Sequence, residues 1–184
     1  MYTTVDQPMP PSPPPTLPRA APSPGPLSVL LLLILLQYGC DSATTTAPAL
    51  PPGTPPPQSL PTTRMTVGKA ELELEIADED PEREIGLMYR AAMPAGHGML
   101  FIFPDEVPRS FWMKNTYIPL DILYLDARGK IVSIKPMRPL NLDGVTSEKP
   151  AKFAIELNRG GAAATGAAVG DVIAVPPDLV AGAR

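Results

Sequence analysis

The sequence has very few of the residues that build covalent or metal-bound frameworks. Its 184 residues include one cysteine, Cys40, and one histidine, His97. These counts exclude a disulfide framework, a Cys/His zinc site and a haem-attachment motif, so we expect no metal site and no cofactor. No apolar run approaches the roughly 20 residues that a membrane-spanning helix needs, which also argues against a polytopic membrane protein.

Charge is scarce in the first third of the chain, where proline is abundant. Residues 1–64 hold 17 of the 27 prolines, whereas residues 65–184 have the charge content of an ordinary globular domain. Proline-rich, weakly hydrophobic sequence cannot offset the entropy cost of folding. The predicted organisation is therefore a leader (1–40), a Pro/Thr-rich disordered linker (41–64), one folded domain (65–176) and a short tail (177–184).

A short apolar run in the leader predicts export. The run from Leu27 to Leu36 has about half the length of a membrane-spanning helix, which suits the core of a secretory signal. Gly39 and Cys40 follow, and a cysteine in that place resembles the bacterial lipoprotein signal, in which it is acylated and becomes the mature N-terminus. We expect an extracytoplasmic protein, in the periplasm or at the cell surface, held to the membrane by a lipid at Cys40. Simple cleavage of the signal is the alternative.

The remaining sequence predicts a mainly β (α+β) fold. Residues 69–76 alternate between apolar side chains and glutamates, including Glu75, so we expect a half-buried strand with a solvated acidic face. Because two expected strands are apolar on both faces, a small closed or partly closed β-barrel, antiparallel or mixed, with one or two short helices is favoured. The other expected elements are a helix at 81–91, capped by Asp80, strands at 99–103, 120–125, 130–134, 152–157 and 169–173, and a weak helix within 158–169.

Side chains suited to ligand binding are most concentrated between Pro108 and Asp126. In a functional interpretation, the cationic, amide and aromatic groups of this segment line a pocket. In a structural interpretation, Trp112 belongs to the core and Asp121 ties a turn through hydrogen bonds, since a carboxylate facing apolar side chains needs a partner. From the residues alone we favour the structural interpretation. The candidate ligand-binding residues are Arg109, Trp112, Lys114, Asn115 and Asp121.

Evidence for catalysis is weak. Asp121 and Glu156 could perform acid/base hydrolysis as a pair of carboxylates, but their separation in space does not follow from the sequence. We therefore assign no catalytic residue and lean against an enzyme. The net charge of −4 at pH 7 also argues against a nucleic-acid partner, because phosphate binding needs a basic surface.

Three motifs resemble a known family. The segments Glu84–Arg90, Gly98–Pro104 and Ser110–Asp121 are closely similar to the bacterial and archaeal domain-of-unknown-function family 192 (DUF192), and the resemblance extends over about residues 66–175. It implies a compact β-rich domain, often with an export or lipoprotein signal, and no agreed biochemical activity. The signature positions of the family fall on Gly86, Met88, Arg90, Gly98, Met99, Trp112, Lys114, Asn115, Pro119, Asp121 and Glu156.

These observations together predict a non-enzymatic, exported and membrane-tethered domain that binds a small molecule, a glycan or an envelope protein. A hydrolase that uses Asp121 and Glu156 is one alternative, and a structural assembly module without a ligand is another.

Overall fold

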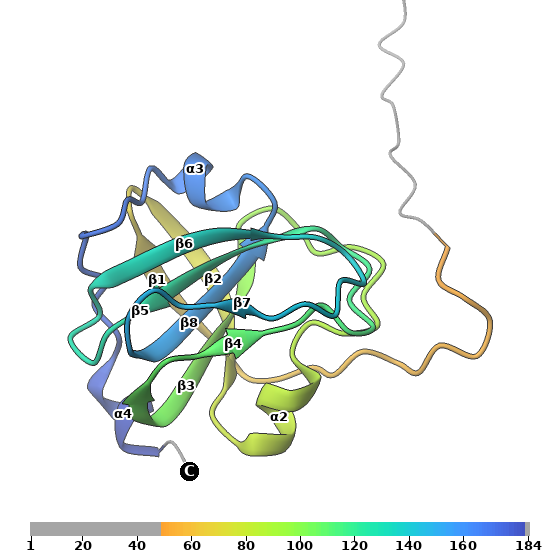
Figure 1. The fold of residues 1–184 in the computed structure, drawn as a ribbon, viewed down its shortest axis with the longest axis horizontal. Helices are drawn as coiled ribbons and strands as arrows, with labels where there is room; N and C mark the ends of the chain where they lie inside the picture. Colours follow the sequence, from red (N-terminus) through yellow and green to blue (C-terminus); the bar gives the residue numbers. More distant parts are fainter. Residues whose placement is uncertain (1–48, 183–184) are drawn as a thin grey trace, which may run out of the picture. The chain divides into compact units, whose positions relative to one another are not determined.

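The computed structural model describes residues 49–182, which form a mixed six-stranded sheet, a small two-stranded sheet and short helices (Figure 1). The large sheet has the order β1-β2-β3-β8-β5-β6, and β4 pairs with β7. The strands are β1 (Thr62–Val67), β2 (Ala70–Ala77), β3 (His97–Val107), β4 (Ser110–Phe111), β5 (Leu120–Leu125), β6 (Ile131–Met137), β7 (Val145–Thr146) and β8 (Ala151–Asn158). The helices are α2 (Asp80–Ile85), α3 (Gly161–Thr165) and α4 (Pro177–Gly182). Within residues 49–182, no helix is both long and apolar enough to cross a membrane.

The folded part extends beyond both expected boundaries. The predicted leader with Cys40, and the linker as far as residue 48, lie outside the described residues. The end of the predicted linker belongs to the sheet, because β1 begins at Thr62 and pairs antiparallel with β2. At the other end, α4 lies in the predicted tail, where Leu179 and Val180 pack against the core.

The pairing of the large sheet is antiparallel except between β2 and β3. The mainly β prediction is confirmed, but within the described residues the sheet order runs from β1 to β6 without a pairing that closes a barrel. The strand expected at residues 169–173 is reduced to one bridge between Lys130 and Val172. Gly170, at φ +103°, turns the backbone there, so the segment covers only part of the β6 edge.

Helix α2 is shorter than the 81–91 that the sequence predicts. It ends at Gly86, whose φ of +50° and ψ of −131° leave the helical region, a conformation that glycine adopts at little cost. A Cβ at Gly86 would lie 3.3 Å from the ring of Phe101, so close packing also disfavours a side chain. The helix start differs as well: Glu79, not Asp80, is the N-cap, and Glu82 completes a capping box.

Each face of the large sheet is covered by its own apolar cluster. On one face, side chains of β3, β5 and β8 pack with β1, α3 and α4. On the other face, the loops around Leu87, Met93 and Met113 cover the sheet. Every residue of β5 is buried, as its continuous apolar sequence predicts for a strand that is covered on both sides. Figure 1 shows α2 and α3 at opposite ends of the sheet.

Candidate functional site

A surface groove lies between α2 and the connection from β3 to β4. Its volume is about 690 Å³, and its walls come from residues 80, 81, 83, 84, 103–105 and 108–112. The groove therefore brings together residues from all three sequence motifs: Glu84 from the first, Phe103 and Pro104 from the second, and Ser110, Phe111 and Trp112 from the third. Two predicted ligand-binding residues, Arg109 and Trp112, line it, and Lys114 places its ammonium nitrogen 5.0 Å from the centre of the Trp112 ring.

Two arginines are held in place around one ring of this groove. The guanidinium carbon of Arg109 lies 3.9 Å from the centroid of Phe103, and that of Arg83 lies 5.5 Å from it. Arg83 donates to the carbonyl of Ile102 (2.6 Å), and Arg109 donates to the carbonyl of Ala151 (3.3 Å). Cation–π contacts and backbone acceptors therefore fix the positions of both guanidinium groups.

Carboxylates at the rim partner the same arginines. Arg83 forms an ion pair with Asp80 at 2.7 Å, and Arg109 forms one with Asp105. The hydrogen bond from Arg109 is the largest cause that lowers the pKa of Asp105. The Asp80 and Asp105 side chains keep 94% and 60% of their surface exposed, so both carboxylates can still accept hydrogen bonds from a ligand.

Trp112 is 48% exposed, so the structural interpretation, which placed it in the core, is wrong for this residue. Behind it, aromatic rings lead into the protein. Phe111 makes edge contacts with Phe101 and Tyr124, at centroid distances of 4.9 and 5.8 Å. The groove thus has one aromatic side chain at the surface and an aromatic wall beneath it.

A narrow cavity of about 30 Å³ continues from the groove into the sheet. The groove and the cavity share Arg83, Glu84, Phe111 and Trp112 as lining residues, and the cavity also reaches Glu156. Glu156 is only 4% exposed. Burial raises its pKa from 4.5 to about 8, and the nearby charge of Arg90 opposes this rise only in part. Glu156 is therefore protonated and neutral at pH 7, and no hydrogen bond contributes to the shift of its pKa.

Glu156 lies in a row of side chains that crosses four strands. Glu75 on β2 pairs with Met99 on β3, Met99 pairs with Glu156 on β8, and Glu156 pairs with Ile122 on β5. Partners in register point to the same side of a sheet. The two glutamates thus share a face, about 10 Å apart across two strand spacings.

Arg90 compensates only one of these two glutamates. It donates from both terminal nitrogens to Glu75, at 2.6 and 2.9 Å, and these side chains are 13% and 17% exposed. The sequence pattern assigned Glu75 to a solvated face, and this prediction is wrong. The Nε of Arg90 is the one buried side-chain nitrogen or oxygen in the described residues that has no hydrogen-bond partner.

Asp121 lies on the opposite face of the sheet from Glu156. The residue that pairs with Glu156 is Ile122, and consecutive strand residues point to opposite faces. The Oδ2 of Asp121 accepts the backbone N–H groups of Gly160 (2.8 Å) and Ala162 (3.4 Å) at the start of α3. This geometry favours the structural interpretation of Asp121. It also contradicts a catalytic pair, since the two carboxylates cannot reach one substrate.

Asn115 supports the loops near the groove. Its side chain donates to the hydroxyl of Tyr89 (2.9 Å), and its carbonyl accepts the Tyr89 N–H (2.8 Å). Asn115, Tyr89 and Leu140 are the non-glycine residues with positive φ in the described part of the chain. Leu140 joins the same loops by donating its N–H to Thr116. Strained residues of this kind persist where the surrounding structure holds them, often at functional sites.

The structure thus brings Arg109, Trp112 and Lys114 together and leaves Asn115 and Asp121 elsewhere. Sequence reasoning missed Arg83 and Phe103, which complete the groove, and it missed the contact of Arg90 with Glu75. Among residues 49–182, no group of three His, Cys, Asp or Glu side chains is arranged to hold a metal ion.

The fold and site define a small, mixed-sheet domain with an aromatic, arginine-lined groove that narrows toward a buried carboxyl group. The chain belongs to the DUF192 family, described as "Uncharacterized ACR", whose profile matches residues 63–175. The family resemblance seen in the motifs is therefore confirmed.

Two solved structures are similar to this chain. A protein from Sinorhizobium meliloti 1021, described as a candidate transcription regulator, is 37% identical with a TM-score of 0.56; the match covers 60% of this chain and 89% of that protein. A protein of unknown function from Novosphingobium aromaticivorans DSM 12444 is 26% identical with a TM-score of 0.57, covering 71% and 94%. No curated protein matches the chain.

Proposed function

We propose that this protein is a non-enzymatic binding module that takes a glycan chain into the groove between α2 and β4, on the outer side of a membrane. The observation that carries the proposal is the half-exposed Trp112 in a groove whose arginines are already fixed. Sugar rings offer flat C–H faces to an aromatic side chain. Their hydroxyl groups can donate to Asp80 and Asp105 and accept from the arginine side chains.

The charge of the groove supports a polar, weakly charged ligand. Its ionisable lining residues are two arginines and three carboxylates: Arg83, Arg109, Asp80, Glu84 and Asp105. A strongly anionic ligand would meet the carboxylates, and a strongly cationic one would meet both arginines. A ligand with many hydroxyl groups can hydrogen-bond to both the arginines and the carboxylates, and removing it from water costs less free energy than removing an ion.

A binding role is favoured over hydrolysis by the position of the carboxylates. Hydrolysis of a glycosidic bond by two carboxyl groups needs both beside the same bond. Asp121 and Glu156 project from opposite faces of the sheet. Asp121 is also engaged by the backbone of α3, so it has a structural task already.

A nucleic-acid ligand is the second candidate, because one similar structure is described as a candidate transcription regulator. The chain has 15 Lys and Arg against 19 Asp and Glu, and phosphate binding requires a concentrated positive surface. We therefore consider nucleic acid a less favoured ligand than a glycan.

Membrane tethering through a lipid on Cys40 belongs to the same proposal and is supported by the leader sequence alone. The mass of the mature N-terminus tests it. A diacylglycerol-modified Cys40 would support tethering, and a chain that still carries residues 1–39, or an unmodified Cys40, would contradict it. The Cys40→Ser variant is expected to move from the membrane fraction to the soluble fraction.

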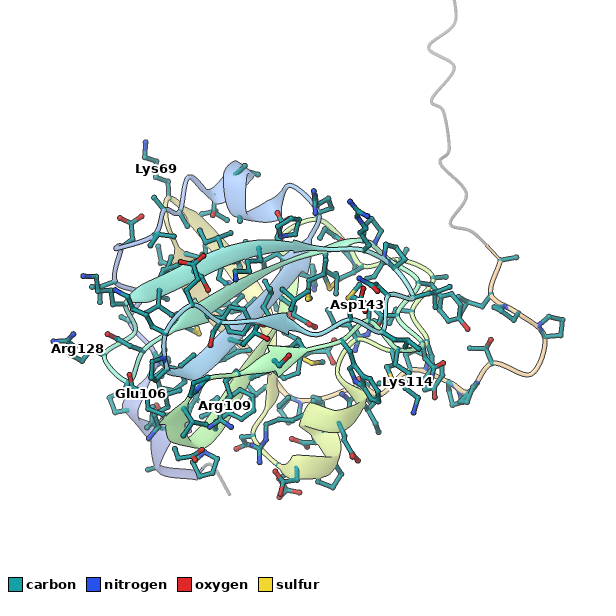
Figure 2. All side chains as sticks on the ribbon, in the orientation of Figure 1. Lys69, Glu106, Arg109, Lys114, Arg128 and Asp143 are labelled. Carbon is teal, nitrogen blue, oxygen red and sulfur yellow. The ribbon has the colours of Figure 1, made fainter. Side chains whose placement is uncertain are left out.

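Trp112 is the only tryptophan in the chain, so its emission reports directly on the groove. We would titrate the full chain with neutral cell-wall oligosaccharides and with other neutral oligosaccharides. A saturable change in emission is expected, and Arg109→Ala should weaken it at least tenfold. Arg128→Ala is the matched control, since Arg128 lies on the exposed β5–β6 turn, away from the groove (Figure 2).

Calorimetry with Trp112→Phe provides a second readout. The proposal is wrong if the folded protein shows neither an emission change nor heat with any oligosaccharide. It is also wrong if Arg109→Ala and Arg128→Ala bind an oligosaccharide equally well.

A further inference from the structure

The buried cluster behind the groove contains one more carboxyl group than cations. Arg90 is bound by Glu75 through two hydrogen bonds, so its charge is already matched. Glu156 then has no counter-ion of its own within residues 49–182. A buried carboxyl group in this situation must either keep a proton or receive a cation from outside.

The charged and titratable groups around Glu156 come from four elements, and none supplies the missing cation. Arg90, in the loop after α2, is matched by Glu75 of β2. On β5, Tyr124 is the group whose pKa is raised by burial and by the nearby charge of Glu156. At the cavity mouth, Arg83 of α2 pairs with Asp80, and Glu84 adds a further negative charge.

The shape of the cavity restricts what can enter. A water molecule needs about 10–15 Å³ of such space, and the cavity offers about 30 Å³. It can hold one or two heavy atoms, which is the size of the terminal CH₂–NH₃⁺ of a linear amine. The walls include the rings of Phe101, Phe111 and Trp112, and aromatic faces attract ammonium groups.

We propose that this cavity binds the terminal ammonium group of a linear alkylamine carried by the groove ligand, with the Glu156 carboxylate as its counter-ion. This inference rests on the proposed function, because the amine enters from the groove. On binding, the neutral acid releases its proton to solvent while the ammonium group keeps all of its own. The products are one carboxylate–ammonium pair in the cavity and one proton in solution.

The first test uses the full chain and n-propylammonium, with n-propanol as the uncharged analogue of similar size. Calorimetry in two buffers with different ionisation enthalpies measures proton release. We expect saturable binding of the amine with release of up to one proton, and affinity about tenfold lower at pH 6 than at pH 7, because protons compete for Glu156. Tetramethylammonium is too wide for the cavity and should not bind. Equal binding of n-propanol or tetramethylammonium would overturn the proposal.

Glu156→Gln keeps the size of the side chain and removes its charge, so it should lose at least tenfold in amine affinity and release no proton. Glu106→Gln is the matched control, because Glu106 is an exposed carboxylate on β3 that does not line the groove or the cavity (Figure 2). Unchanged amine binding by Glu156→Gln would refute the role of Glu156.

The neutral oligosaccharide titration separates this inference from the proposed function. If oligosaccharides change the Trp112 emission of both the native chain and Glu156→Gln while n-propylammonium binds neither, only the ammonium cavity is wrong. If nothing binds to the folded native chain, both proposals are wrong. Two further amines distinguish the kind of molecule that carries the ammonium group. A 2-aminoethyl glycoside represents an amine on a sugar, and Nα-acetyl-lysine amide represents an amine on a peptide. The one that also changes the Trp112 emission identifies the class.

Discussion

Glu156 makes the stability of the folded protein depend on pH. Its pKa is about 8 in the folded state, against 4.5 for an ordinary glutamate. Between these values the folded protein holds a proton that the unfolded chain has lost. Unfolding therefore becomes more favourable as pH rises, with a slope that approaches about 1.4 kcal/mol per pH unit.

The expected size of the effect follows from the two pKa values. Stability from this group is fully present below about pH 4.5, decreases through the neutral range and is lost above about pH 8. The whole shift corresponds to a loss on the order of 5 kcal/mol. Because the side chain is buried, screening by solvent does not reduce this value in the way it does at a surface. A typical domain has a free energy of unfolding of about 5–15 kcal/mol, so the change is large enough to measure.

The assay is urea denaturation of the native chain, Glu156→Gln and the control Glu106→Gln at several pH values from 5 to 9. Glutamine cannot ionise, so Glu156→Gln should lack this loss of stability. Its stability relative to the native chain should increase by roughly 2 kcal/mol between pH 6 and pH 8. The control should follow the native chain. Parallel curves for the native chain and Glu156→Gln would refute a buried, neutral Glu156.

Three further substitutions test other parts of the structure. Asp121→Asn should lower the free energy of unfolding by about 1–3 kcal/mol, because asparagine is a weaker acceptor for the two backbone N–H groups at α3. It should leave oligosaccharide binding unchanged, and loss of binding with an intact fold would contradict this. Arg90→Gln should lower the free energy of unfolding, measured by urea denaturation, by about 3–5 kcal/mol, because it leaves the largely buried carboxylate of Glu75 without its partner. A loss below about 1 kcal/mol would show that the pair is effectively solvated. Tyr124→Phe should cost about 0.5–1.5 kcal/mol in thermal unfolding, since it removes the hydroxyl donor to a carbonyl of β7; an unchanged melting temperature would show that this bond contributes nothing.

Much of the architecture could be predicted because strands leave a local signature. The alternation of residues 69–76 and the continuous apolar run at 120–125 correspond to β2 and β5 almost residue for residue. The turn between β5 and β6 was also predictable, because Asp126 and Gly129 are typical turn residues. In the structure Asp126 accepts two backbone N–H groups and Gly129 has a φ of +77°. The helix at 81–91 was overextended, since a glycine can continue a helix or end it. The positive φ of Gly86 and the Phe101 ring beside it are not visible in the local sequence.

The groove was only half predictable. Arg109, Trp112 and Lys114 are close in sequence, so their density drew attention to them. Arg83 and Phe103 come from other segments, and they reach the site because α2 connects the parallel strands β2 and β3. Nothing in the local sequence around these two residues indicates that they face the same space.

The sequence alone located the strands β2, β3, β5, β6 and β8, the family motifs and the expected export signal, because each of these features depends on neighbouring residues. Only the tertiary structure decided that Glu75 and Glu156 share a face while Asp121 lies on the other. That outcome depends on strand order and on register between strands far apart in the chain. A shift of one residue in that register would turn Glu156 to the opposite face of the sheet. The pairing of β3 with β8 is therefore what turns an ordinary glutamate into a buried acid behind the groove.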